Sequence, residues 1–158
     1  MIPPGHLNAL REISTRFSGS DFEWALTGST SFSLQGIPVM VNDIDIQTDV
    51  YGAYKIGDLL SSYVARTIQF SIGERIRSHY GQFIVQGIPV DVMGDVQKRE
   101  IDGDWEEVVD IRPYTRKVKV KELNIPVLDL EYEVLAYKKM GREVRAAMLR
   151  EWLDQKQT

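Results

Sequence analysis

The sequence predicts an α+β fold in which a mixed β-sheet is flanked by helices and a short pair of helices closes the chain. Two hydrophobic patterns favour this class, because apolar residues recur every three or four positions in some segments and at alternate positions in others. The first pattern is typical of amphipathic helices and the second of half-buried strands. The 158 residues contain no internal repeat, low-complexity tract or linker, so we expect one domain over residues 1–158.

The first part of the chain predicts helices and strands in turn. Leu7, Leu10 and Ile13 follow helical spacing, and prolines stand before them, where the start of a helix tolerates them. Further along, the segment DIDIQT alternates with a period of two, which is typical of a half-buried strand. The patterns predict a helix at 4–17, a strand at 22–27, a helix at 30–35, a strand at 43–48 and a helix at 52–62.

The second part predicts a hairpin, a further strand and the closing helices. Gln86-Gly87 lies between two apolar segments, as expected of a tight hairpin turn. A polar excursion, KREIDGDW, follows the hairpin. Asp129 suits the N-cap of the closing helices, which occupy about 129–156 with Gly141 between them. The predicted elements are strands at 67–71, 80–85, 88–93 and 115–120, and helices at 130–140 and 142–155.

The composition narrows the possible chemistry. The chain has no cysteine and only two histidines, which excludes disulfides, thiolate metal sites, cysteine nucleophiles and a three-histidine metal site. A formal net charge of -4 argues against a general nucleic-acid coat. No apolar run approaches the roughly 20 residues that span a bilayer, and the N-terminus lacks the pattern of a signal peptide. We therefore expect a cytoplasmic protein with no membrane contact.

Asp43 and Asp45 are the first candidate ligands for a metal. Residues two apart in a strand point to the same side, so both carboxylates project together while Ile44 and Ile46 enter the core. Two like charges this close repel each other unless cations neutralise them. Oxygen ligands favour a hard cation, so we expect Mg²⁺ or Mn²⁺.

Asp91 is the candidate for a third carboxylate. It lies alone between Val90 and Val92 in an apolar strand, and such a residue is costly without a partner or a metal. If this strand lies beside the strand at 43–48, the three carboxylates converge. Asp95 is the alternative, although its position after Gly94 favours a turn residue.

The turn at Gly28 and Ser29 is a candidate phosphate site. Where a strand turns into a helix, free backbone N–H groups and the helix dipole favour an anion. Gly28 allows a close approach of the backbone, and Ser29 could cap the helix and bond to a phosphate oxygen. Thr30 adds another hydroxyl to this turn.

Together these residues resemble a known pattern. Gly28-Ser29, thirteen intervening residues, Asp43-Ile44-Asp45-Ile46 and a later Asp91 are similar to the motif of the nucleotidyltransferase superfamily, which has the DNA polymerase β-like fold. Within it, the chain most resembles small prokaryotic nucleotidyltransferase-like proteins, over nearly its whole length.

The resemblance implies a reaction and a role for each residue. Asp43 and Asp45 would bind two Mg²⁺ ions that hold a nucleoside triphosphate, ATP or another, and Gly28 and Ser29 would hold its triphosphate tail. Asp91 would bind the catalytic metal and help to deprotonate the acceptor. The enzyme would transfer a nucleoside monophosphate to a hydroxyl and release pyrophosphate.

Two basic residues near the C-terminus are further candidates for nucleotide binding. Members of the superfamily often place a lysine and an arginine here, near the nucleotide, and Lys138 and Arg142 are four residues apart on one expected helix face. The alternative is that both simply stabilise the end of a helix.

Other functions stay open at this point. The chain could be a non-catalytic, nucleotide-binding or regulatory module of a two-protein, toxin–antitoxin-like system, with a partner protein. An enzyme that adds nucleotides to tRNA is a further alternative, against which the acidic net charge counts. The acceptor could be a small molecule, a protein or an RNA.

Overall fold

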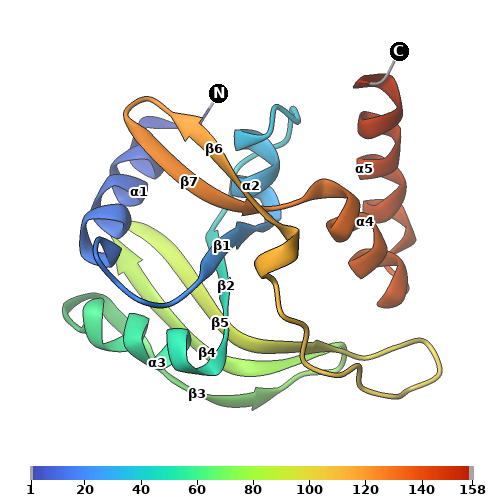
Figure 1. The fold of residues 1–158 in the computed structure, drawn as a ribbon, viewed down its shortest axis with the longest axis horizontal. Helices are drawn as coiled ribbons and strands as arrows, with labels where there is room; N and C mark the ends of the chain where they lie inside the picture. The colour runs from blue at the N-terminus through green and yellow to red at the C-terminus, as the bar shows by residue number, and fades with distance from the viewer. Residues whose placement is uncertain (1, 157–158) are drawn as a thin grey trace.

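The structure is a computed structural model that describes residues 2–156. These residues fold around one mixed sheet (Figure 1). Its strands are β1 (Trp24–Thr27), β2 (Ile44–Thr48), β3 (Val64–Ile72), β4 (Ile76–Val85), β5 (Ile88–Lys98), β6 (Thr115–Val120) and β7 (Leu123–Leu128). They lie in the order β3-β4-β5-β2-β1-β7-β6. β2 pairs in parallel with β5, β1 pairs in parallel with β7, and the other neighbours are antiparallel. The predicted α+β class with a mixed sheet is confirmed.

Helices cover the sheet in two groups (Figure 1). They are α1 (Pro4–Phe17), α2 (Gly28–Leu34), α3 (Val50–Leu59), α4 (Leu130–Lys139) and α5 (Glu143–Lys156), with short 3-10 turns at Ser61–Tyr63 and Arg112–Tyr114. Leu10 of α1 and Ile56 of α3 belong to the larger core cluster, together with Ile44 of the sheet. The second cluster joins α2, α4 and α5 through residues such as Phe32 and Val134. No helix within residues 2–156 is long and apolar enough to cross a membrane.

Most predicted elements are present, with shifted ends. The helix predicted at 4–17 coincides with α1. α3 begins at Val50, earlier than predicted, because the Asp49 carboxylate accepts a hydrogen bond from the Gly52 N–H at 2.7 Å and caps the helix. Asp129 holds the N-cap position of α4 as predicted, although its side chain makes no capping hydrogen bond.

The strand β7 was not among the predicted elements. Its Pro126 lacks an N–H group, and a proline normally argues against a strand in the interior of a sheet. β7 nevertheless lies between β1 and β6. The pairing between β7 and β1 consists of a single residue pair, Leu26 with Val127. The proline is tolerated because so short a ladder does not need its N–H group.

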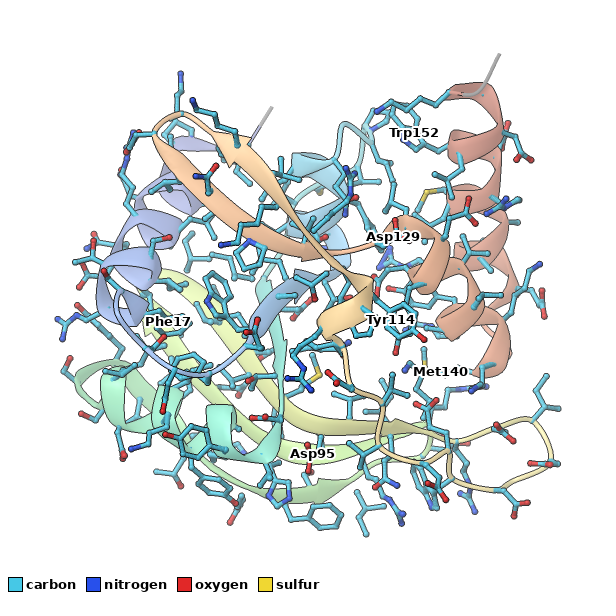
Figure 2. The ribbon with its side chains drawn as sticks, in the orientation of Figure 1. Phe17, Asp95, Tyr114, Asp129, Met140 and Trp152 are labelled. Atoms are coloured by element: carbon cyan, nitrogen blue, oxygen red, sulfur yellow. The ribbon has the colours of Figure 1, made fainter. Side chains whose placement is uncertain are left out.

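A bulge in β5 determines which side chains reach the face that carries Asp91. The pairing with β4 shifts register between Arg77 and His79, and opposite them Asp95 has a positive φ of 51°. The extra residue reverses the alternation, so Lys98 lies on the same side as Asp91. Asp95 is therefore a bulge residue rather than the turn residue expected, and its carboxylate accepts a hydrogen bond from the Val50 N–H at 3.0 Å beside the start of α3 (Figure 2).

Candidate active site

Asp45 and Asp91 are direct neighbours across the parallel pair of β2 and β5. Both side chains lie on the face opposite the buried Ile44 and Val90, as the alternation predicted. They line a pocket of about 220 Å³ together with Gly28. The adjacency on which the sequence argument depended is therefore present.

The Asp45 carboxyl is buried close to other negative charges. Burial, followed by the charges of Asp91 and Asp43, raises the pKa of Asp45 to about 7. A hydrogen bond between the Asp45 and Asp91 carboxyls contributes to the same shift. Two carboxylates in this position are hard oxygen donors that a divalent cation would neutralise, so the pair fits such an ion.

Asp43 has no partner in the register that pairs β2 with β5. It precedes β2, and it does not line the pocket that Asp45 and Asp91 share. Within residues 2–156, no group of three or more aspartate, glutamate or histidine side chains is arranged so that it could hold a metal ion. The structure thus brings together two of the three predicted carboxylates in the pocket, and Asp43 acts on Asp45 through its charge.

Gly28 is the first residue of α2 and lies against the Asp45 carboxylate. Its φ is +72°, in the region that favours glycine, and a Cβ atom at this position would overlap Asp45 Oδ2. Only glycine therefore allows the backbone to approach the carboxylate this closely. Gly28 lines the pocket, and its role near the phosphates stays a prediction.

Ser29 and Thr30 are buried and engaged with the segment before β2. The Ser29 hydroxyl accepts a hydrogen bond from the Asn42 N–H at 2.9 Å, and the Thr30 hydroxyl donates to the Asp43 carbonyl at 2.9 Å. The N-cap of α2 is Thr27, so the prediction that Ser29 caps this helix is wrong. Both hydroxyls hold the loop that carries Asp43, and neither residue lines the pocket.

Of the two predicted basic residues, the pocket contains one. Arg142 lines it, and the guanidinium Cζ lies 5.4 Å from the centre of the Tyr137 ring. Lys138 is exposed and does not line the pocket. α4 ends at Lys139, so Lys138 and Arg142 do not share one helix face as the sequence suggested.

Glu133 is a pocket residue that the sequence analysis missed. Its side chain is only 3% exposed, and its carboxylate accepts a hydrogen bond from the Thr27 hydroxyl at 2.7 Å and another from the Gly28 N–H. Burial raises the pKa of Glu133 to about 7. A signal was present, since Glu133 occupies the apolar helical face of Leu130, Val134 and Tyr137.

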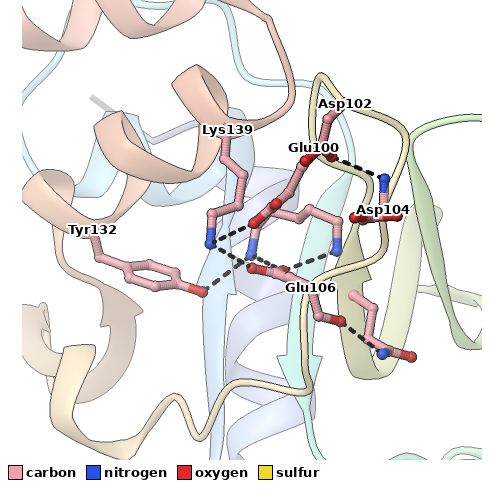
Figure 3. A network of polar contacts seen from close by, with 8 residues as sticks. Glu100, Asp102, Asp104, Glu106, Tyr132 and Lys139 are labelled. Atoms are coloured by element: carbon pink, nitrogen blue, oxygen red, sulfur yellow. Dashed lines mark hydrogen bonds and ion pairs between the residues drawn. The ribbon is translucent and has the colours of Figure 1, made fainter.

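Lys98 is the second residue that was missed, because the segment that it begins, KREIDGDW, was interpreted as a polar excursion. Its buried ammonium group pairs with Glu106 at 3.0 Å and donates to the Tyr132 hydroxyl at 3.1 Å (Figure 3). Lys139 pairs with the other oxygen of Glu106 at 3.2 Å, so this network ties the loop after β5 to α4. Burial acts to lower the pKa of Lys98, but Tyr132 and Glu106 raise it overall, so the amine stays charged.

A mixed sheet that holds paired aspartates beside a Gly-Ser turn defines the nucleotidyltransferase superfamily, as the resemblance of the motifs implied. The chain belongs to the aminoglycoside-2''-adenylyltransferase family, whose model matches residues 9–153. It is thus an enzyme of the nucleotidyltransferase class. A comparison with curated protein sequences gives no match.

Solved structures agree with this assignment. A Thermotoga maritima protein assigned as a nucleotidyltransferase is 49% identical, with a TM-score of 0.85 over 98% of this chain and 96% of that one. The lincosamide antibiotic adenylyltransferase LnuA, solved with lincomycin, is 17% identical, with a TM-score of 0.52 over 80% and 82% of the two chains. ANT(2'')-Ia, solved with adenylyl-2''-tobramycin, is 8% identical, with a TM-score of 0.53 over 97% and 99%. The last two share the fold.

Proposed function

We propose that the protein transfers a nucleoside monophosphate from a nucleoside triphosphate to a hydroxyl of a small acceptor molecule, with release of pyrophosphate, in the presence of Mg²⁺ or Mn²⁺. The observation that carries this proposal is the direct pairing of Asp45 with Asp91 in a pocket that also contains Gly28. ATP is the first candidate donor, since the family is one of adenylyltransferases.

The charges that line the pocket support a metal-bound triphosphate. Asp45 and Asp91 supply carboxylates to the pocket, and Arg142 supplies a positive charge. Glu133 and Lys98 also line it, but the Lys98 ammonium is paired with Glu106. A divalent cation would be held by Asp45 and Asp91, with Asp43 adding its charge from outside the pocket. When bound, the cation would neutralise the phosphate oxygens. The Arg142 guanidinium, rather than the paired Lys98 ammonium, would face the remaining phosphate charge.

The residues of the chain would each contribute to the transfer. Gly28 lets the backbone approach the phosphates, and Ser29 and Thr30 hold the loop before β2 in place. Asp91 would accept the proton of the acceptor hydroxyl. Most of the rate would come from positioning and charge neutralisation, as is usual for phosphoryl transfer.

Structures with the same fold support a small acceptor. LnuA was solved with lincomycin and ANT(2'')-Ia with adenylyl-2''-tobramycin, and each of these is a small molecule. We therefore place a hydroxyl-bearing small molecule ahead of a protein or an RNA as acceptor.

Calorimetric titration of the four nucleoside triphosphates, with and without Mg²⁺, tests the proposal. Wild type is compared with Asp45→Asn and with Asp95→Asn, a matched control on β5 whose residue does not line the pocket. We expect Mg²⁺-dependent binding of at least one triphosphate, weakened at least about 10-fold in Asp45→Asn because a cation ligand is lost, and retained in Asp95→Asn. No binding by wild type to any of the four would refute the proposal.

A further inference from the structure

The Asp91 carboxylate receives two hydrogen bonds from the neighbouring strand β4. The Tyr80 hydroxyl donates to Asp91 Oδ1 at 3.0 Å, and the Gln82 amide donates to the same oxygen at 2.9 Å. Gln82 is paired directly with Asp91 in the antiparallel register, and Tyr80 is paired with Met93, two residues further along β5. Alternate residues of a strand share a face, so both donors lie on the face of the pocket.

The two donors also determine how Asp91 is oriented. The last torsion of an aspartate side chain is broad, so a carboxylate without fixed partners can rotate. Among residues 2–156, no lysine, arginine or histidine forms an ion pair with Asp91, so its orientation depends on hydrogen bonds. With Oδ1 held by β4, the carboxylate meets the Asp45 carboxyl on the adjacent strand.

The position of Tyr80 is itself supported from β3. The guanidinium Cζ of Arg66 lies 5.3 Å from the centre of the Tyr80 ring, and Arg66 is paired with Gln82 in the register of β3 and β4. The ring is thus covered on the side of the edge strand, and its hydroxyl points along the sheet to Asp91. Replacing tyrosine with phenylalanine would keep this stacking and remove only the hydrogen bond.

We propose that Tyr80 and Gln82 are positioning residues for the nucleotidyl transfer, which hold one oxygen of Asp91 so that its carboxylate stays beside Asp45 as a ligand for the divalent cation. The inference rests on the proposed function and extends it to two residues of β4. Hydrogen bonds to a cation ligand typically change metal affinity by roughly 10- to 100-fold.

Titration with Mn²⁺ followed by electron paramagnetic resonance, alone and with ATP, tests this role without the acceptor. The variants are Tyr80→Phe, Gln82→Met and their combination. Tyr54→Phe is the matched control, because its hydroxyl bonds to His79 at 3.0 Å on the other face of the sheet. We expect Mn²⁺ affinity to fall about 10-fold in each single variant and further in the double variant, with wild-type affinity in Tyr54→Phe.

The outcomes separate this inference from the proposed function. Wild type that binds Mn²⁺ and ATP, together with variants that bind Mn²⁺ equally well, would overturn the positioning role alone. Wild type that binds neither would overturn both. The midpoint of chemical unfolding is measured for every variant, and if the double variant fails to fold, the Tyr80→Phe variant decides the question.

Discussion

The Glu133 carboxylate accepts a hydrogen bond from the Thr27 hydroxyl at 2.7 Å, although the two residues are 106 positions apart in the chain. Thr27 ends β1 and immediately precedes Gly28, whose N–H is the second donor to Glu133. Through this contact α4 is attached to the turn beside Asp45. Because the Glu133 carboxylate is buried, its ionisation makes the free energy of unfolding depend on pH.

We expect Glu133→Gln to stabilise the protein at neutral pH. Burial raises the pKa of Glu133 to about 7, whereas a glutamate in an unfolded chain titrates near about 4.3. Between these values the unfolded chain holds fewer protons, so the free energy of unfolding falls as the pH rises from about 4 to about 7. The glutamine cannot ionise, so the variant should gain up to about 4 kcal/mol over wild type at pH 8, at about 1.4 kcal/mol for each unit of the pKa difference, and match it near pH 4.

Chemical denaturation at pH 4, 6 and 8 measures this difference. The control is Glu143→Gln, which changes an exposed glutamate at the start of α5 and should leave the pH dependence as it is in wild type. Equal slopes against pH for wild type and Glu133→Gln would contradict the prediction.

Gly28→Ala should weaken nucleotide binding more than it weakens the fold. The new Cβ would overlap Asp45 Oδ2, so the carboxylate must leave its present position beside Asp91. The positive φ adds strain of about 1 kcal/mol. Gly19→Ala is a matched control, since Gly19 has a similar φ of +76° and no atom within 4 Å of the added Cβ.

Calorimetry with Mg²⁺ and ATP, together with chemical denaturation, separates the two effects. We expect about 1 kcal/mol or more of destabilisation in both alanine variants, and a loss of affinity of at least about 10-fold in Gly28→Ala only. Wild-type affinity in Gly28→Ala would show that the turn does not position Asp45.

Lys98→Met should destabilise the protein strongly, because it leaves the buried Glu106 carboxylate without its nearest cation. The Lys98 and Glu106 side chains are each only 5% exposed. Breaking a buried pair of this kind costs about 3 kcal/mol. The double variant Lys98→Met/Glu106→Gln should lose less, because neither charge then remains in the interior.

Chemical denaturation of the single and double variants checks this expectation. The comparison pair is Arg11 and Glu122, which lie 2.6 Å apart with side chains 42% and 58% exposed. Arg11→Met should cost less than about 1 kcal/mol, since an exposed ion pair contributes little. A loss of the same size in Lys98→Met would mean that the buried network does not stabilise the fold.

Part of the candidate site could be predicted because it depends on local patterns. Alternation within a strand places Asp45 and Asp91 on the polar side of their strands, and the structure agrees. The turn at Gly28 was recognised from residue type, and its φ of +72° explains why glycine is there. Lys98 could not be assigned in this way, because the bulge at Asp95 reverses the alternation that the prediction depends on.

The sequence by itself determined the class of the fold, the amphipathic helix at 4–17, the two opposite faces of the strands and the motif that led to the nucleotidyltransferases. These features depend on residues a few positions apart, whose spacing reflects the 3.6-residue and two-residue periods of the backbone. Only the tertiary structure decided that β2 lies beside β5, that Asp43 lies outside the pocket, and that Glu133 and Lys98 lie within it. Strand order and helix docking are set by the burial of surfaces distant in sequence, and no local pattern contains that information.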